Sequence, residues 1–258
     1  MNEQELRQQI IDACLYLKKT GLIARTWGNV SARLNENEFI ITPSGLDYEL
    51  TKPEDLVIVN ISDCSYNKEQ RKPSSEKLVH AAAYKARPDV NFIIHTHQLY
   101  ASAICADEAS IRLSDNTFVP CADYGLPSTS KLEKNCAKEF DVFKTENMFL
   151  MAKHGVVVFG ETMQEALDRA DLLEKECKVI FDKRVKEFII PENMKPYLDD
   201  YAQMFPLNDG EDEEAIKMVK EKNAAAQLYA INSKPLSFID AKLQHLIYKA
   251  KYSKLRGK

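Results

Sequence analysis

Two of the five histidines in the chain, His95 and His97, are separated by one residue at the end of an apolar segment, VNFIIHTH. Residues i and i+2 of a β-strand point to the same face, about 6.5–7 Å apart. Two imidazoles placed in this way can share one ion, with Zn–N bonds of about 2.0–2.1 Å. A third histidine, His154, follows another apolar segment, and three imidazoles with one open position describe a catalytic zinc site. Hydrogen-bonded histidines without a metal give the same pattern, and the helical settings of His80 and His245 favour core or surface roles.

Hydroxyl and carboxylate groups gather in a second stretch, SSE (74–76), which precedes a helical pattern. Ser74 or Ser75 can cap that helix, and a carboxylate in its first turn interacts favourably with the helix dipole. A helix start with two hydroxyls and free N–H groups is also a binding site for anions. Glu76 beside it could then serve as a general base. Both interpretations fit the residues.

The elements predicted around these residues alternate between helices and strands. The helix at 3–19 ends at Thr20-Gly21, and the helix at 161–188 begins with Thr162 as N-cap and Glu165 completing a capping box. RTWGNVSAR (25–33) is interpreted as a turn. We therefore predict one α/β domain over residues 1–188 and a helical C-terminal extension over 189–258. The remaining predicted helices are 74–87, 99–106 and 131–140, and the strands are 39–42, 56–61, 90–97, the start of 118–125 and two within 148–160.

Composition and charge exclude several classes of protein. The chain has 258 residues and a net charge of −4, which argues against nucleic-acid binding by bulk electrostatics. No apolar run approaches the roughly 20 residues that span a bilayer, so no membrane association is expected. The six cysteines form no close CxxC pair and are expected to be reduced, as in a cytoplasmic protein. The basic end of the chain is interpreted as a solvated tail rather than a binding patch.

Six short motifs occur in one order along residues 5–185 and together resemble the class II aldolase/adducin family. Within that family the chain is most similar to the aldolases of L-fuculose 1-phosphate. The motifs are GNVS (28–31), TPSG (42–45), SSE (74–76), HTH (95–97), VPCADYG (119–125) and KHG (153–155).

The resemblance implies a three-layer α/β/α sandwich around a mainly antiparallel sheet, assembled as a homotetramer with active sites between subunits. It implies that His95, His97 and His154 bind a divalent ion, usually Zn²⁺, with Mn²⁺ or Co²⁺ as alternatives. Glu76 would move the substrate proton, and would also ligate the ion when substrate is absent. The residues implied to hold the phosphate of a sugar substrate are Gly28, Asn29, Ser44, Gly45, Ser74 and Ser75.

The implied reaction is the reversible cleavage of a ketose 1-phosphate to dihydroxyacetone phosphate and a small aldehyde such as lactaldehyde. Tyr124 matches a family tyrosine that would cross to the neighbouring subunit and protonate the aldehyde oxygen, although the sequence alone favours a buried loop tyrosine. A phenol with a pKa near 10 suits that role. Trp27 is expected to serve packing.

Other functions on the same scaffold remain open. A pentulose-5-phosphate 4-epimerase tends to carry aspartate at the position of Glu76, whereas a methylthioribulose-1-phosphate dehydratase keeps the glutamate; a decarboxylase is a further alternative. Non-catalytic, adducin-like assembly proteins lack the metal ligands.

The sequence departs from the family pattern at two places that affect substrate specificity. Lys153 precedes His154 where relatives often carry an uncharged residue, and the C-terminal tyrosine of the family has two candidates, Tyr197 and Tyr201.

Overall fold

The computed structural model describes residues 2–23 and 26–187. The chain divides into two units, Met1–Lys178 and Val179–Lys258, and the description below concerns the first unit together with the whole of the last helix that begins in it. Its helices are α1 (Glu3–Lys19), α2 (Lys77–Ala86), α3 (Leu99–Cys105), α4 (Ser130–Val142) and α5 (Met163–Glu187), with a 3₁₀ turn at Pro53–Asp55. Its strands are β1 (Gly28–Arg33), β2 (Glu38–Ile41), β3 (Val57–Asn60), β4 (Phe92–Thr96), β5 (Ile111–Arg112), β6 (Phe118–Val119), β7 (Cys121–Ala122), β8 (Met148–Met151) and β9 (Gly155–Gly160).

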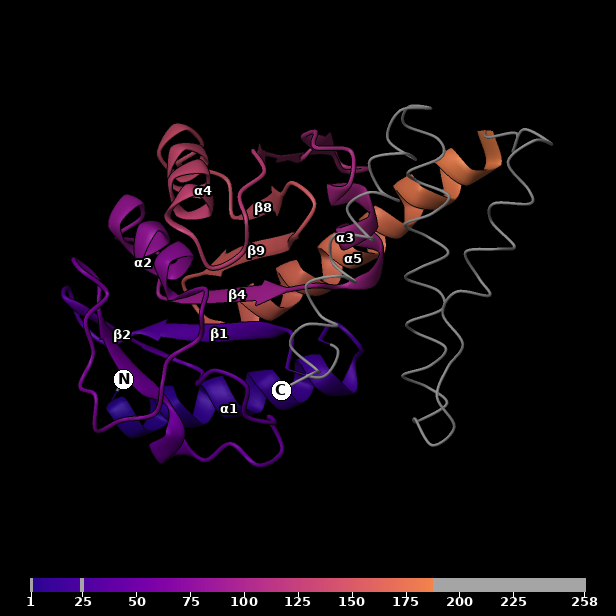
Figure 1. The fold of residues 1–258 in the computed structure, drawn as a ribbon. Helices are drawn as coiled ribbons and strands as arrows, with labels where there is room; N and C mark the ends of the chain where they lie inside the picture. Colours follow the sequence, from indigo (N-terminus) through magenta and orange to yellow (C-terminus); the bar gives the residue numbers. More distant parts are fainter. Residues whose placement is uncertain (1, 24–25, 188–258) are drawn as a thin grey trace, which may run out of the picture. The chain divides into compact units, whose positions relative to one another are not determined.

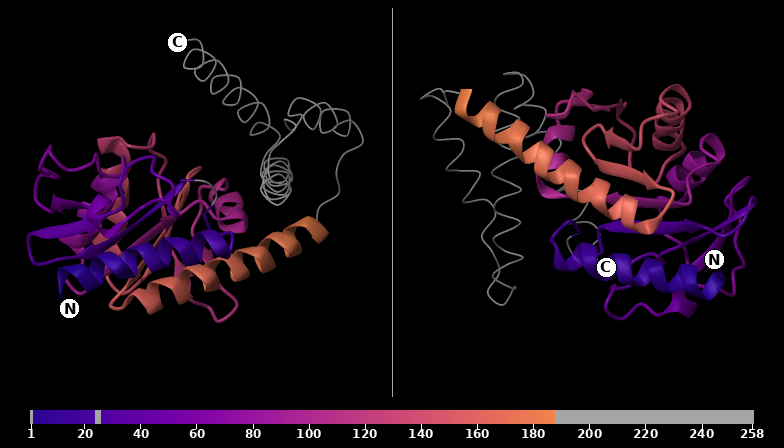
Figure 2. Two further views of the ribbon diagram at one scale, coloured as in Figure 1. Left: turned by 90° about the horizontal axis from the view of Figure 1, so that it is seen from below. Right: turned by 180° about the vertical axis from the view of Figure 1, so that it is seen from behind.

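Seven strands form one sheet in the order β3-β2-β1-β4-β9-β8-β7. Every pairing in it is antiparallel except that of β7 with β8. Helices α1 and α5 lie side by side on one face, and α2 and α4 cover the other (Figures 1 and 2). The predicted α/β/α sandwich around a mainly antiparallel sheet is thus confirmed.

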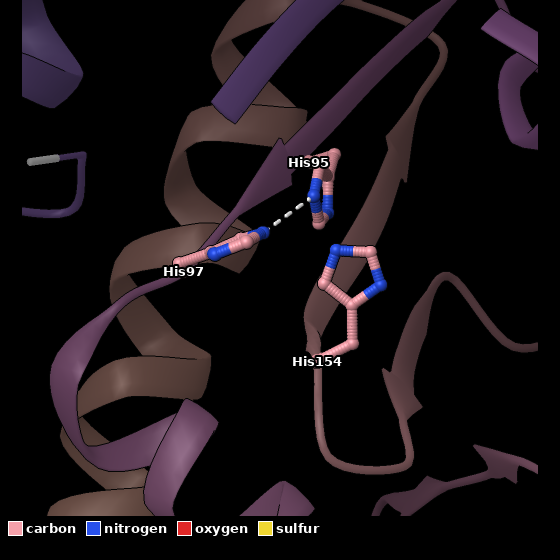
Figure 3. Close-up of side chains that lie close together, drawn as sticks. All are labelled: His95, His97 and His154. Atoms are coloured by element: carbon pink, nitrogen blue, oxygen red, sulfur yellow. Dashed lines mark hydrogen bonds between the residues drawn. The ribbon is translucent and has the colours of Figure 1, made fainter. Parts of the chain in front are cut away.

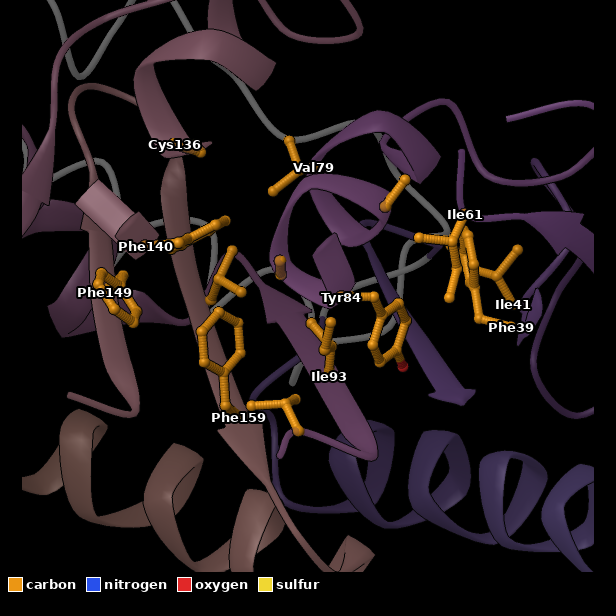
Figure 4. Close-up of a cluster of buried hydrophobic side chains, with 14 of the residues drawn as sticks. Phe39, Ile41, Ile61, Val79, Tyr84, Ile93, Cys136, Phe140, Phe149 and Phe159 are labelled. Carbon is orange, nitrogen blue, oxygen red and sulfur yellow. The ribbon is translucent and has the colours of Figure 1, made fainter. Parts of the chain in front are cut away.

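A cluster of buried apolar side chains fills the space between the sheet and the α2/α4 layer (Figure 4). Phe140 from α4 packs against Phe149 of β8 and Phe159 of β9, with ring centroids 4.8 and 5.1 Å away. Tyr84 from α2 packs on Phe39 of β2 at 5.2 Å. Because these side chains hold α2 on the sheet, they also fix the residues at the start of that helix.

The predicted ends of α1 agree with the structure. Asn2 caps α1 and forms a capping box with Glu5, and Thr20 ends the helix before Gly21, whose φ is 77°. At the start of α5, the Thr162 hydroxyl accepts a hydrogen bond from the Glu165 amide at 3.2 Å. The Glu165 carboxylate, however, accepts from the amide of Glu161 rather than from that of the capping residue.

The interpretation of RTWGNVSAR as a turn was wrong. Residues 28–33 of that stretch form β1, in the interior of the sheet between β2 and β4. Asn29 and Ser31 are buried together with Val30 and Ala32 because helices cover both faces of the sheet. Residues 29–33 alternate between polar and apolar side chains, as a strand does, but the glycine and asparagine at 28–29 favoured a turn. The segment 118–125 also differs from expectation, since it contributes β6 to a separate two-stranded sheet and β7 to the main one.

Some of the predictions concern residues that the structure does not describe. The extension predicted over residues 189–258, and with it Tyr197 and Tyr201, lies outside the described residues, so the boundary at 188 stays a prediction. The six cysteines, all within the described residues, form no disulfide with one another, and five of them are buried. Among the described helices, none combines the length and the hydropathy that crossing a membrane requires.

Candidate functional site

Three histidines converge at one end of the sheet (Figure 3). His95 is near the end of β4, His97 follows that strand, and His154 lies in the turn between β8 and β9. Because β9 pairs with β4, the turn is held next to the end of β4. The ring centroids are 4.8–5.0 Å apart, and one nitrogen from each ring lies within 4.8 Å of the others.

The ring nitrogens are arranged as metal coordination requires. His95 Nδ1 lies 2.9 Å from the carbonyl oxygen of Val156, which can only accept, so Nδ1 carries the proton and Nε2 faces the cluster. His97 Nε2 lies 3.0 Å from His95 Nε2. Two ligands of a tetrahedral zinc ion are about 3.4 Å apart, given bonds of about 2.0–2.1 Å, so a small shift admits the ion. Burial lowers the pKa of His95 to about 4, which keeps it neutral, the form that binds metal. The three residues therefore fit a divalent ion.

Gly155 allows the two strands that carry these histidines to approach closely. A Cβ atom at this position would lie 2.5 Å from the carbonyl oxygen of Thr96, 3.0 Å from His97 Cδ2 and 3.3 Å from His95 Cε1. The first of these contacts is with backbone and cannot be relieved by a side-chain rotation. The glycine of the KHG motif is thus explained by packing against the histidine cluster.

We expect Gly155→Ala to weaken metal binding, because the added methyl group separates β9 from β4 and moves His154 away from His95. The expected loss in zinc affinity is about 10- to 100-fold, the usual effect of disturbing the residues that orient metal ligands. Competition with a chromophoric chelator measures this affinity. Val158→Ala, a change at another buried position of β9, serves as the control for lost stability and should bind zinc normally. Equal affinities of wild type and Gly155→Ala would contradict the prediction.

Lys153 does not place its charge among the histidines. It has a positive φ of 55°, and its ammonium group forms a 2.7 Å ion pair with Glu108. The amide of Lys153 also donates to the carbonyl oxygen of Cys105 at 2.9 Å. The cation beside His154 is therefore balanced by Glu108, and the turn that carries His154 is attached to the end of α3.

Glu76 lies directly before α2 and is buried. Its Oε1 accepts hydrogen bonds from the amide and the hydroxyl of Ser128, at 2.8 and 3.2 Å. Its Oε2 is buried and has no hydrogen-bond partner among the described residues. Burial raises the pKa of Glu76, and the two bonds from Ser128 oppose that rise. Glu76 is not part of the three-histidine group. A buried carboxylate with one unused oxygen has the properties of a general base.

The serines before α2 do not cap it as the sequence suggested. Ser74 Oγ accepts from the Glu76 amide at 3.3 Å, which makes a tight turn, and the first helical residue is Lys77. Ser74 is buried and Ser75 is exposed.

Three stretches proposed for phosphate binding meet in the structure although they are distant in the sequence. The amide of Thr42 donates to the carbonyl oxygen of Val30 in β1 at 3.1 Å, and the amide of Ser74 donates to that of Thr42 at 3.0 Å. An antiparallel bridge joins Pro43 to Pro73. These bonds place residues 28–30, 42–45 and 73–76 next to one another.

Close packing explains why residue 28 is a glycine. A Cβ atom there would lie 2.7 Å from Ile23 Cδ1 and 2.8 Å from the carbonyl oxygen of His95. Its neighbour Asn29 stands opposite His95 in the pairing of β1 with β4. The candidate phosphate residues and the histidine cluster are therefore parts of the same end of the sheet.

Two aromatic residues are more exposed than a packing role would require. Trp27 was expected to serve packing, yet its side chain is 45% exposed. Tyr124 is 39% exposed, not a buried loop residue. Its role at the site of a neighbouring subunit stays a prediction.

His80, which sequence reasoning assigned to a core or surface role, is fully buried and bonds to a candidate site residue. Its Nε2 contacts Asn29 Oδ1, and its Nδ1 lies 2.6 Å from Ser31 Oγ. Its position four residues after Glu76 was an available signal, because residues i and i+4 share a helix face. Ser128, the partner of Glu76, had no such signal, since the chain separation is 52 residues.

Comparisons with known proteins agree with this geometry. Residues 8–181 match the family model of the class II aldolase and adducin N-terminal domain. The L-fuculose phosphate aldolase of Haemophilus influenzae is 34% identical over 181 residues, covering 67% of this chain and 81% of the relative. The 5-methylthioribulose-1-phosphate/5-deoxyribulose-1-phosphate aldolase of Escherichia coli is 33% identical over 174 residues, covering 65% and 79%.

The fold is shared with solved structures as well. YgbL of Klebsiella pneumoniae superimposes with a TM-score of 0.62 at 26% identity, over 70% of this chain and 91% of that one. The motifs, the family match over most of the first unit and the aldolase relatives all agree. The chain belongs to the class II aldolase and adducin family.

Proposed function

We propose that this protein is a metal-dependent aldehyde-lyase that reversibly cleaves a ketose 1-phosphate, such as L-fuculose 1-phosphate, to dihydroxyacetone phosphate and a small aldehyde such as lactaldehyde. The observation that carries the proposal is the convergence of three histidines at the end of the sheet where the candidate phosphate-binding stretches also meet. The match to an aldolase family and the aldolase relatives support the lyase class.

His95, His97 and His154 would hold the ion, with Zn²⁺ favoured by three imidazoles and Mn²⁺ or Co²⁺ as alternatives. When bound, such an ion supplies a Lewis acid that stabilises negative charge developing on the substrate's oxygen atoms. The pairing of Glu76 Oε1 with Ser128 favours a proton-transfer role for this carboxylate over a permanent place among the ligands.

Glu76 would take the proton from the carbon that becomes the nucleophile in the condensation direction, through the oxygen that has no partner. Ser128 holds the other oxygen and so fixes the direction of the carboxylate. In cleavage the same carboxyl group returns that proton to carbon. Tyr124 would exchange a proton with the aldehyde oxygen from a neighbouring subunit, which requires the homotetramer that the family resemblance implies.

The phosphate group would be bound where the three stretches meet. Asn29 and Ser74 are buried and would form the floor of the site, whereas Ser44, Gly45 and Ser75 are exposed and would form its rim. Gly28 contributes by permitting the close packing of β1 against β4. Binding energy from the phosphate then positions the reacting carbons at the metal centre.

Other functions of the family make different predictions. A non-catalytic, adducin-like role would not explain why all three histidines converge or why Glu76 is kept buried. An epimerase or a decarboxylase would act on the same type of substrate without releasing dihydroxyacetone phosphate. The relative that acts on 5-methylthioribulose 1-phosphate and 5-deoxyribulose 1-phosphate favours one specific alternative, the same cleavage with a different aldehyde.

A substrate panel tests the proposal. Zinc-reconstituted protein is mixed with the 1-phosphates of fuculose, rhamnulose, ribulose, 5-deoxyribulose and methylthioribulose, and separately with a pentulose 5-phosphate. Consumption of each substrate is followed by chromatography, and release of dihydroxyacetone phosphate by a coupled assay. We expect release from at least one of the first four, and none from metal-free protein. Conversion of methylthioribulose 1-phosphate or a pentulose 5-phosphate without release of dihydroxyacetone phosphate would overturn the proposal in favour of a dehydratase or an epimerase.

A further inference from the structure

The side chain of Asn29 is held by a chain of buried hydrogen bonds that runs through His80. His80 lies in α2 and is fully buried, and its Nε2 contacts Asn29 Oδ1. Its Nδ1 lies 2.6 Å from Ser31 Oγ, which in turn lies 2.8 Å from the hydroxyl of Tyr84. The four residues thus connect α2 to β1 behind the candidate phosphate site.

The chemistry of these groups sets the direction of every bond. An amide oxygen can only accept, so His80 Nε2 carries the proton and donates to Asn29. His80 is neutral because burial lowers its pKa to about 3, so Nδ1 accepts from the hydroxyl of Ser31. The hydroxyl of Tyr84 then donates to the oxygen of Ser31 at 2.8 Å, the shorter of its two contacts, the other being with the carbonyl oxygen of Asn91 at 3.4 Å.

The amide of Asn29 is thereby fixed in one orientation. Within the described residues its side chain bonds only through Oδ1, so both N–H groups of Nδ2 remain available to a ligand. A reversed amide would present oxygen to the ligand and leave His80 with an unpaired buried donor, which is unfavourable. An anionic group at this site therefore meets a donor and not an acceptor.

We propose that His80 is a positioning residue for phosphate recognition, which holds the Asn29 amide with its NH₂ group toward the substrate phosphate. This inference rests on the proposed function for the identity of the ligand, a phosphorylated ketose. It assigns to His80 no contact with substrate and no part in proton transfer. Its effect is expected in affinity for phosphate and not in the chemical step.

The test compares His80→Phe, which removes the donor and keeps a buried ring, with Asn29→Ala and with the double variant. Each is reconstituted with zinc, and calorimetry measures binding of inorganic phosphate, dihydroxyacetone phosphate and unphosphorylated dihydroxyacetone. We expect His80→Phe to lower the affinity for inorganic phosphate and for dihydroxyacetone phosphate by about tenfold. This is the lower end of what one hydrogen bond to a charged group contributes. Binding of dihydroxyacetone and zinc content should not change.

Controls separate positioning from lost stability. Val79→Ala, a buried change at the preceding position of α2, should lower the unfolding temperature yet keep phosphate affinity. His80→Gln, whose amide can still donate to Asn29, should recover most of the affinity. If His80→Phe does not fold, Ser31→Ala tests the same chain, because it removes the group that holds His80 Nδ1.

These binding measurements test the role of His80 without requiring that the protein catalyse the proposed reaction. If His80 acts through Asn29, then adding His80→Phe to Asn29→Ala costs no further affinity. Additive losses, or a loss for His80→Phe no greater than for Val79→Ala, would overturn the inference. Binding of inorganic phosphate without binding of dihydroxyacetone phosphate would instead refute the proposed function, and the phosphate data would still decide the role of His80. Failure of the wild type to bind either phosphate ligand would overturn both.

Discussion

Replacement of His95 by alanine is expected to abolish stoichiometric binding of a divalent ion, and with it all aldol cleavage. His95 is the most buried of the three histidines, and its Nδ1 proton is committed to Val156, so its Nε2 has one orientation. With two imidazoles left, the centre loses a ligand that no described side chain of the cluster can replace. Zinc content after dialysis, measured by mass spectrometry of the metal, should fall from one ion per chain to near zero.

A second buried histidine provides the control for this experiment. His80→Gln changes an imidazole that lies outside the cluster and should retain one ion per chain. Circular dichroism of both variants checks that the fold is kept. A His95→Ala protein that retains a full zinc complement after dialysis would show that the ion binds elsewhere.

Glu76→Gln is expected to lower kcat by about 10²-fold or more while the metal stays bound. Glutamine has the same size and can still accept the Ser128 bonds through its oxygen, but its NH₂ group cannot take a proton. A positioned general base contributes about 10²- to 10⁴-fold in rate. Steady-state kinetics on the best substrate of the panel measure the loss, and zinc content should match the wild type.

Acid inactivation of the wild type should reflect protonation of the Glu76 carboxylate. Because burial raises the pKa of Glu76, the carboxylate is lost on acidification at a higher pH than for an exposed glutamate. Glu139→Gln is the matched control, since burial also raises the pKa of Glu139 but the residue lies on α4 outside the site. Its kcat and pH profile should resemble those of the wild type. A kcat for Glu76→Gln equal to that of the wild type would show that Glu76 is not the general base.

Local spacing made part of the site predictable from the sequence. His95 and His97 share a face because they are two residues apart at a strand end, and that relation does not depend on the rest of the fold. His154 could be proposed from the apolar segment before it and from the family resemblance, but spacing could not establish its approach to His95, which depends on the pairing of β4 with β9. The end of α1 at Thr20-Gly21 was likewise a local feature, and its prediction is confirmed.

What the sequence could not show arises from tertiary contacts. β1 was taken for a turn because a glycine precedes an asparagine at 28–29. The burial of Asn29 and Ser31 becomes reasonable only once His80 is known to bond both of them. The meeting of residues 42–45 with 73–76 depends on the bridge between Pro43 and Pro73 and on the bond from the Ser74 amide to Thr42, and no periodicity encodes these contacts.

An anomalous-scattering experiment at the zinc edge on crystals of the zinc-reconstituted protein tests the metal centre most directly. The geometry predicts one strong peak per chain, bounded by His95 Nε2, His97 Nε2 and one ring nitrogen of His154, each about 2.0–2.1 Å from the ion. A map with no peak among these three rings, or with its principal peak at other residues, would contradict the account.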